Sequence, residues 1–301
     1  MFIFAEDEES QNMKSQLVEM FGSAASQFPN STVGSNGNVV YIKSPVTETR
    51  TKEISADGKF VFLKDANGSY TLTEYLGTDT VVNLPETAPD GVSTYALGDY
   101  YETFDEGQEY KQTKWDLVGY AFASHYSGGE MWSNKYEVFA ENSNIKQVNI
   151  PANVTKIGAT FYRATSLEKI TIAEGSLLTH IGCNAFKETR NLQIFDLPEG
   201  LEVIGYAAFS ECFPQDIEGI MDLKFILPST VEVIMEYFLN NCPNVKILYN
   251  GNATDFANVE VIEDENSEPL ANIVYYYSEE QPTETGNYWH YDIDGVTPIV
   301  W

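Results

Sequence analysis

The sequence predicts a solenoid, a stack of similar coils that each add one strand to a common parallel sheet. The first observation is a repeated phrase: a leucine-rich stretch, a spacer, an Ile-Gly step, and an apolar residue five positions after that Ile. The second is its period. The copies start 22, 25, 31 and 22 residues apart, at Ile145, Leu167, Leu192, Leu223 and Val245. A period in the twenties is typical of coil stacks and not of an ordinary globular core.

Each copy is predicted to contain one strand and one inward-packing turn. The strand alternates apolar and polar residues and usually ends at a proline, which cannot donate a hydrogen bond to a sheet. The apolar residue after the Ile-Gly step is expected to lie inside the stack. These pairs are Ile157 and Tyr162, Ile181 and Phe186, Ile204 and Phe209, and Ile234 and Leu239. The third copy is longer, and residues 213–222 are its expected insertion.

A small residue recurs three positions after each of these apolar residues. The four residues are Thr165, Thr189, Cys212 and Cys242. A small residue repeated at one register predicts an internal ladder, which explains two of the three cysteines as packing. A disulfide between Cys212 and Cys242 is the alternative, because neighbouring coils would bring them close. No CxxC pair occurs, so the sequence predicts no zinc site.

The combination of Ile-Pro, Ile-Gly and Ala-Phe, followed by Cys or Thr, resembles the BspA-type leucine-rich repeat. Residues 70–101 are similar to the family's first coil and residues 275–301 to the tails of some members. The resemblance implies an α/β solenoid, a right-handed leucine-rich-repeat coil stack with one parallel sheet. It also implies a secreted or cell-surface protein that adheres to a host, matrix or cell-surface protein or glycan.

Three regions are expected along the chain. Residues 1–69 are predicted to be a cap region with an amphipathic helix at 8–28, a strand at 38–43 and a β-hairpin centred on residues 65–68. The solenoid follows at 70–250. Residues 251–301 are predicted to form an acidic, aromatic C-terminal cap.

An insertion is expected inside the first full coil. Leu97 and Gly98 match the Ile-Gly step and Phe139 matches the late aromatic residue, which leaves an insertion at about 99–138. The insertion is rich in aromatic residues, and its candidate binding residues are Trp115, Tyr126 and Trp132. Such side chains stack on sugars or anchor protein partners. The alternative is a small core that the insertion forms for itself.

The outward residues of the predicted strands form a second candidate surface. Down the stack they change from polar to apolar. The candidate binding residues are Lys169, Ile194, Lys224, Ile226, Ile247 and Tyr249. An exposed apolar patch is typical of an interface. Two alternatives remain: the tail at 275–301 folds over the patch, or the strand register slips in the fourth copy.

Charge excludes two classes of partner. The chain has 45 acidic and 17 basic residues, a net charge of −28, and residues 247–301 contain 11 acidic residues and no Lys or Arg. Such a field repels nucleic acid and anionic lipid. No apolar run has the length of a membrane span, so we expect no membrane insertion. The first ten residues are too short and too acidic for an intact signal peptide, so export rests on the resemblance.

The sequence contains no catalytic motif. The G-x-S-x-G, H-E-x-x-H and P-loop patterns do not occur, and the three histidines are scattered. His180 precedes an inward Ile and is expected to be an exposed turn residue. Asp292 and Asp294 begin a calcium-loop pattern that lacks its later ligands, so a turn is expected. We therefore expect a recognition module without enzymatic activity or cofactor; an enzyme that uses the insertion and a self-associating scaffold are the alternatives.

Overall fold

The computed structural model describes residues 31–33, 39–41, 50–98, 138–214, 223–242, 245–262 and 270–301. The chain divides into two compact units. The first, residues 1–50 and 104–133, contributes two described strands, β1 (Ser31–Val33) and β2 (Val39–Tyr41), which pair antiparallel. The predicted helix at 8–28 and Trp115, Tyr126 and Trp132 of the predicted insertion lie outside the described residues.

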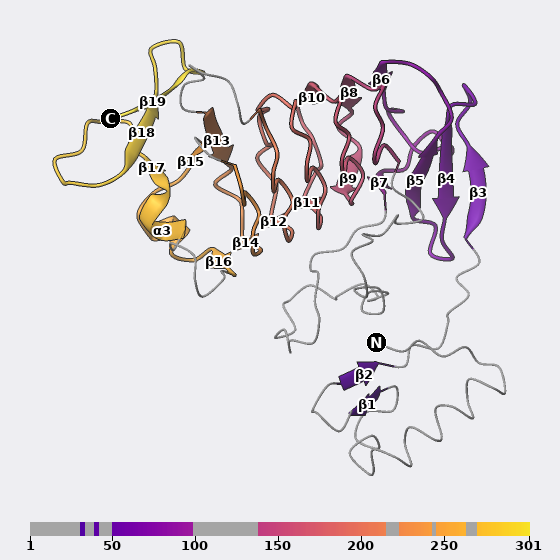
Figure 1. Ribbon diagram of the computed structural model, residues 1–301, viewed down its shortest axis with the longest axis horizontal. Helices are drawn as coiled ribbons and strands as arrows, with labels where there is room; N and C mark the ends of the chain where they lie inside the picture. Colours follow the sequence, from indigo (N-terminus) through magenta and orange to yellow (C-terminus); the bar gives the residue numbers. More distant parts are fainter. Residues whose placement is uncertain are drawn as a thin grey trace. The chain divides into compact units, whose positions relative to one another are not determined.

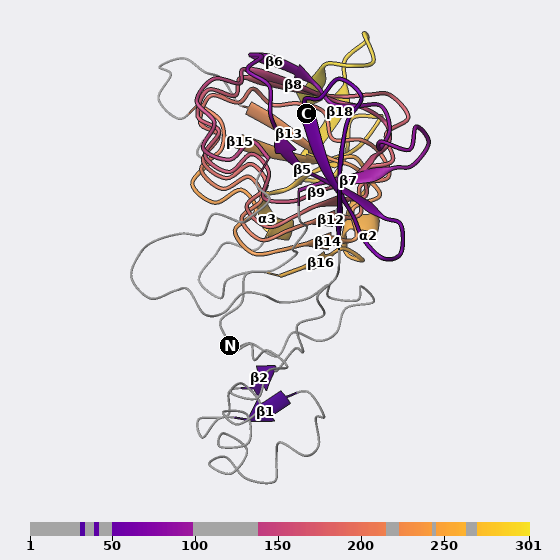
Figure 2. The same cartoon turned by 90° about the vertical axis from the view of Figure 1, so that its right-hand side faces the viewer.

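The second unit, residues 51–103 and 134–301, is a stack of coils (Figure 1). In the first coils the leucine-rich stretches form the predicted strands. They are β6 (Val81–Asn83), β8 (Gln147–Ile150) and β10 (Lys169–Ile172), which pair in parallel in the order β10-β8-β6. Viewed along the stack, successive coils overlap one another (Figure 2).

The Ile-Gly steps form a second parallel sheet, so the prediction of one sheet was wrong. Its strands are β7 (Tyr95–Leu97), β9 (Val154–Ile157), β11 (His180–Ile181), β12 (Val203–Ile204), β14 (Val233–Ile234) and β16 (Glu260–Val261). The N–H of each residue after the Ile donates to the previous coil. Gly182 donates to Ile157 at 2.7 Å and Gly205 to Ile181 at 2.7 Å. This bond explains why the step is a strand and not only a turn.

Three strands that pair antiparallel, one after the other, extend this sheet beyond the first coil. They are β3 (Thr51–Ile54), β4 (Phe60–Lys64) and β5 (Tyr70–Tyr75), and β5 pairs in parallel with β7. The hairpin predicted at residues 65–68 is therefore confirmed. Its turn is held by the Asp65 carboxylate, which accepts from the N–H groups of Asn67 and Ser69, and by Gly68 at φ +90°.

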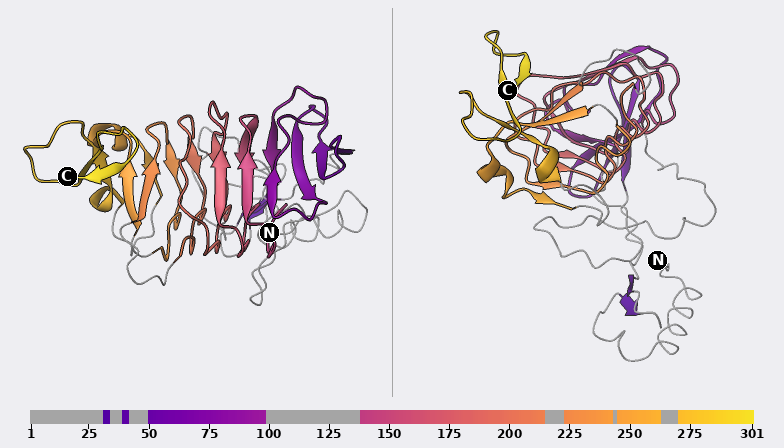
Figure 3. Two further views of the ribbon diagram at one scale, coloured as in Figure 1. Left: turned by 90° about the horizontal axis from the view of Figure 1, so that it is seen from above. Right: turned by 60° about the vertical axis from the view of Figure 1, so that its left-hand side comes forward.

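The last coils and the tail form a third sheet. Its strands are β13 (Leu223–Leu227), β15 (Val245–Tyr249), β17 (Tyr275–Tyr277), β18 (Tyr288–Tyr291) and β19 (Pro298–Val300). All pair in parallel except β19, which is antiparallel to β18. The helices α2 (Ala253–Phe256) and α3 (Leu270–Ile273) are one turn each. Residues 193–197 of the third coil form no strand, so this sheet is separate from β6-β8-β10 (Figure 3).

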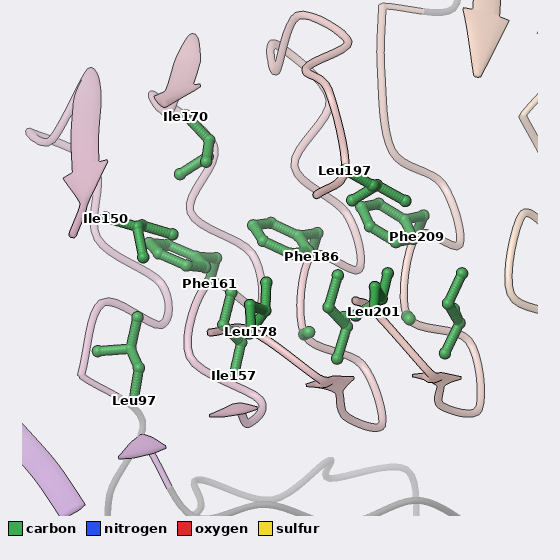
Figure 4. Close-up of a cluster of buried hydrophobic side chains, with 14 of the residues drawn as sticks. Leu97, Ile150, Ile157, Phe161, Ile170, Leu178, Phe186, Leu197, Leu201 and Phe209 are labelled. Carbon is green, nitrogen blue, oxygen red and sulfur yellow. The ribbon is translucent and has the colours of Figure 1, made fainter. Parts of the chain in front are cut away.

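A column of phenylalanine rings runs through the core. Phe139, Phe161, Phe186 and Phe209 stack with centroids 5.4, 5.0 and 5.0 Å apart and ring planes within 14° of parallel. Figure 4 shows three of these rings, Phe161, Phe186 and Phe209. Phe139 and Leu97, which aligns with Ile157 in the sheet, confirm the predicted first coil. Leucine and isoleucine side chains fill the space between this column and the two sheets.

The first repeat departs from the predicted register by one residue. Phe161, and not Tyr162, occupies the column, because one residue fewer separates it from Gly158 than separates Phe186 from Gly182. The small-residue register moves with it. Ala164 is buried at that position, and Thr165 is exposed.

Removing one ring from the column tests its importance. We expect Phe186→Ala to lower the free energy of unfolding by about 3–5 kcal/mol, since the side chain is fully buried between two stacked rings. Urea unfolding followed by circular dichroism measures this. Val92→Ala, at a residue that is 78% exposed, is the control and should change stability by less than about 0.5 kcal/mol. Equal effects of the two substitutions would contradict a core role for the column.

Candidate recognition face

The outer surface of β6, β8 and β10 is a small polar face. Inward residues such as Val148 and Ile170 are buried, and the alternate residues point away from the core. The strand register places the outward residues in two columns: Val81, Gln147 and Lys169 in one, and Asn83, Asn149 and Thr171 in the other. We call these six residues the polar face.

Hydrogen bonds between side chains tie the polar face together. Asn149 is its hub: its Oδ1 accepts from Gln147 Nε2 at 2.8 Å and from the Thr171 hydroxyl, and its Nδ2 donates to Asn83 Oδ1 at 2.6 Å. The three strands are therefore joined by side chains as well as by their backbones. Such a network holds the side chains in fixed positions before any ligand arrives.

Lys169 is an exposed ammonium on this face. Among the described residues its side-chain ammonium makes no hydrogen bond, ion pair or ring contact. Several other basic side chains of the unit are paired. These pairs are Lys52 with Glu74, Lys59 with Asp79, Lys146 with Glu168, Arg163 with Glu141 and Glu188, and Arg190 with Glu188 and Glu211. Lys169 thus remains available to a ligand.

The tail contacts the outward side of the fourth coil. Lys224, an outward residue of β13, donates from its Nζ to the carbonyl oxygen of Pro298 in β19. Leu248 pairs with Ile226 on the same side yet is fully buried. Ile226 is half-buried, as is Ile194, which packs against the edge of the core. Lys224 thus contacts the tail, while Ile194 and Ile226 keep part of their surface exposed.

The register of β15 corrects two predicted surface residues. Ile247 and Tyr249 were expected to point outward, but they are 6% and 1% exposed. They align with Phe225 and Leu227 of β13, which point into the core. The stretch at 245 starts one position later in its coil than the stretches at Ile145 and Leu167, so a pattern counted from Val245 is out of phase by one residue. A shift of one residue exchanges the two faces of a strand.

An aromatic cluster anchors the tail. Trp289 is fully buried, its Nε1 donates to the carbonyl oxygen of Tyr249 at 2.8 Å, and its ring lies 5.3 and 4.8 Å from those of Tyr277 and Tyr291. Burial raises the pKa of Tyr291, and the nearby carboxylates of the third coil add to this effect. The tail therefore packs on the solenoid through a small core of its own.

The cysteines follow the packing interpretation. All three are free thiols. The sulfur of Cys212 lies 2.9 Å from the Thr189 hydroxyl, and the Cys242 thiol donates to the carbonyl oxygen of Phe209 at 3.1 Å, which forms the predicted ladder. Burial raises the pKa of Cys242 to about 12 and that of Cys183 to about 12. These thiols are protonated at neutral pH and are poor nucleophiles.

His180 is buried, contrary to the expectation of an exposed turn. It belongs to β11, pairs with Lys156 and Val203 of the neighbouring strands, and is 5% exposed. Its Nδ1 lies 2.7 Å from the Thr179 hydroxyl. Burial, with a smaller effect of the Lys156 charge, lowers the pKa of His180 to about 4.

The aspartates at the β18-β19 turn are used by the turn itself. Asp294 accepts from the N–H groups of Val296 and Thr297 and from the Thr297 hydroxyl, and these bonds lower the pKa of its carboxyl. Within the described residues, no group of three His, Cys, Asp or Glu side chains is arranged to hold a metal ion. The turn predicted at residues 292–295 is confirmed.

The repeat pattern matches a known family. Residues 135–259 match the family described as the BspA type leucine rich repeat region, in six copies. The coils of residues 135–259 therefore carry the BspA-type leucine-rich repeat. None of the curated proteins compared with the chain matches it.

Two solved leucine-rich-repeat proteins of bacteria are among the structures that the chain matches. A leucine rich cell surface protein from Faecalibacterium prausnitzii A2-165 is 20% identical with a TM-score of 0.45; the match covers 82% of this chain and 60% of that one. The leucine rich repeat protein of T. pallidum is 16% identical with a TM-score of 0.37 and coverages of 78% and 86%. In the part of the chain that the structure describes, no helix is long and apolar enough to cross a bilayer.

His180 gives the repeats a measurable pH dependence. A histidine in an unfolded chain titrates near pH 6.5, so between about pH 6.5 and pH 4 the unfolded state binds more protons than the folded state. The histidine therefore lowers stability progressively as the pH falls through this window. The substitution His180→Val introduces the residue that the next two coils have at this position, and it removes the contribution of the histidine titration to the stability. We expect the Tm of the variant minus the Tm of the wild type to increase by several degrees as the pH falls from 7 to 4.

Thermal melts of both proteins at pH 7, 5.5 and 4 measure this difference. The titration of the many carboxylates is common to both proteins and cancels in the comparison. A difference in Tm that stays constant with pH would contradict the neutral, buried state of the imidazole.

The bond between Lys224 and Pro298 is expected to hold the tail hairpin down. Lys224→Met keeps most of the aliphatic packing and removes the donor. We expect amide hydrogen exchange in residues 288–300 to become faster, while exchange in β8 and β9 stays unchanged. Lys169→Met, at an exposed lysine far from the tail in sequence and without a partner among the described residues, is the matched control. Unchanged exchange in the tail of Lys224→Met would show that the aromatic cluster alone holds it.

Proposed function

We propose that this protein is a non-enzymatic recognition module, secreted or displayed at a cell surface, that binds a host or matrix protein or a glycan through the polar face. The observation that carries the proposal is the hydrogen-bonded network centred on Asn149, which stays solvent-accessible on the first coils. On the fourth coil the outward Lys224 is engaged by the tail. The BspA-type repeats of residues 135–259 support an interaction role.

Three physical properties suit the polar face to binding. It lies on paired strands, which position side chains more accurately than loops do. Its hydrogen-bond network fixes the amide groups, so a ligand loses little free energy in ordering them. Lys169 supplies a positive charge on a chain whose net charge is −28, which sets this face apart from the surrounding acidic surface.

In its biological setting, the module is proposed to act in adhesion at the cell surface. The F. prausnitzii protein described above is a leucine rich cell surface protein. The aromatic insertion stays a second proposed binding region, and its Trp115, Tyr126 and Trp132 lie outside the described residues. None of the three cysteine thiols is activated as a nucleophile, because burial raises their pKa values and keeps them protonated at neutral pH.

An array of purified matrix proteins and glycans, probed with the full chain, tests the proposal. We expect at least one array component to bind the wild type. Asn149→Ala should weaken that binding about tenfold or more, because it removes the hub of the network. Thr165→Ala, at an exposed residue outside the polar face, is the matched control and should bind like the wild type.

Thermal melts of both variants show whether folding is intact, and surface substitutions should change stability little. Binding that survives Asn149→Ala in a folded protein would refute the role of the polar face. Silence of the wild type across the whole array would refute the recognition function as stated.

A further inference from the structure

On the polar face, the N–H donors that remain unused outnumber the unused acceptor lone pairs. The Oδ1 of Asn149 is used twice, and the Oδ1 of Asn83 accepts one bond. Both hydrogens of Asn83 Nδ2 and one hydrogen each of Gln147 Nε2 and Asn149 Nδ2 take no part in these bonds. The three N–H bonds of Lys169 add to them. The unused acceptors are Gln147 Oε1, the second lone pair of Asn83 Oδ1 and the Thr171 hydroxyl oxygen. A ligand that fits this face therefore brings more acceptors than donors, but some of both.

The positive charge of the polar face and its exposed apolar side chain lie at opposite edges of the face. Lys169 lies on β10 and Val81, which is 47% exposed, on β6, with Gln147 between them. Parallel strands are about 4.8 Å apart, so the backbones of β10 and β6 are separated by about 10 Å. This span accommodates two linked sugar rings. The ring with an anionic acceptor belongs at Lys169 and a small apolar substituent at Val81.

We propose that the polar face binds an acidic, N-acetylated saccharide, with a uronic acid carboxylate at Lys169 and the methyl of an N-acetyl group against Val81. This rests on the proposed recognition function and specifies its ligand class. A carboxylate and hydroxyl oxygens accept from these N–H donors, and hydroxyl hydrogens donate to the unused oxygens of the face. The bond between ammonium and carboxylate is charge-assisted.

Other ligand classes fit less well. A peptide strand brings as many N–H donors as carbonyl acceptors. The six residues of the polar face also form no apolar pocket that could hold an aromatic side chain of a peptide. Nucleic acid carries one negative charge per phosphate and is repelled by a protein of net charge −28. A saccharide with one carboxylate for every two rings meets less of this repulsion.

The third coil limits the direction in which the ligand runs. Asp196 is exposed there, in the part of the coil equivalent to β10. A second carboxylate on that side would meet a like charge, whereas on the β6 side the neighbours are Asn83 and Val81. The saccharide therefore extends from Lys169 toward the first coil.

Two tetrasaccharides test the proposal by calorimetric titration of the full chain. Hyaluronan tetrasaccharide alternates glucuronic acid and N-acetylglucosamine, and chitotetraose has N-acetylglucosamine in all four positions and no charge. We expect hyaluronan tetrasaccharide to bind about three- to tenfold more tightly. Lys169→Met should abolish this preference, Lys169→Arg should keep it, and Lys146→Met, which removes a lysine paired with Glu168 beside the face, should leave it unchanged.

The outcomes separate this proposal from the recognition function. Equal binding of the two saccharides, or a preference that persists in Lys169→Met, overturns the carboxylate contact. A second outcome is that neither saccharide binds, while a protein on the array binds the wild type and not Asn149→Ala. This outcome overturns the saccharide ligand, and the recognition function stands with a protein ligand. If neither saccharide binds and the array is silent, both are overturned.

Discussion

The stacking of one phenylalanine ring on the next sets the geometry of the whole solenoid. The rings are 5.0–5.4 Å apart, close to the spacing of about 4.8 Å between parallel strands. Core and backbone therefore repeat along the same axis with nearly the same step, and neither strains the other. The same step carries the outward residues, so Asn83, Asn149 and Thr171 come within hydrogen-bonding distance of their neighbours. The polar face is thus a consequence of the core.

The backbone bond at the Ile-Gly step keeps the coils in register although their lengths differ. Gly205 donates to Ile181 at 2.7 Å, and Met235 donates to Ile204 at 2.9 Å across the long third coil. Because the bond uses only the N–H group, methionine replaces glycine without loss of pairing. In the sequence, the extra residues of that coil lie between β12 and β14 and outside both strands of this ladder. Coils of unequal length therefore still stack.

The repeat was predictable wherever residue identity alone defines a position. Phe186, Phe209 and the ladder from Thr189 to Cys242 stand where the pattern places them. Phe161 was missed because two adjacent aromatic residues offered the same chemistry and the coil is one residue shorter. The second sheet was missed because a strand of two residues shows no alternation. The orientation of Ile247 and Tyr249 needed the partner strand, which no local pattern supplies.

The candidate site depended most on tertiary structure. Lys169 and Lys224 stand at similar outward positions, yet one is exposed and the other bonds to the tail. Only the fold of residues 275–301 decides between them. The strong negative charge of the chain adds a further constraint, since at physiological salt its field decays over about 8 Å. Affinity for the proposed acidic ligand therefore has to come from short-range bonds to a preorganised face and not from electrostatic attraction at a distance. This is the role that we propose for the network around Asn149.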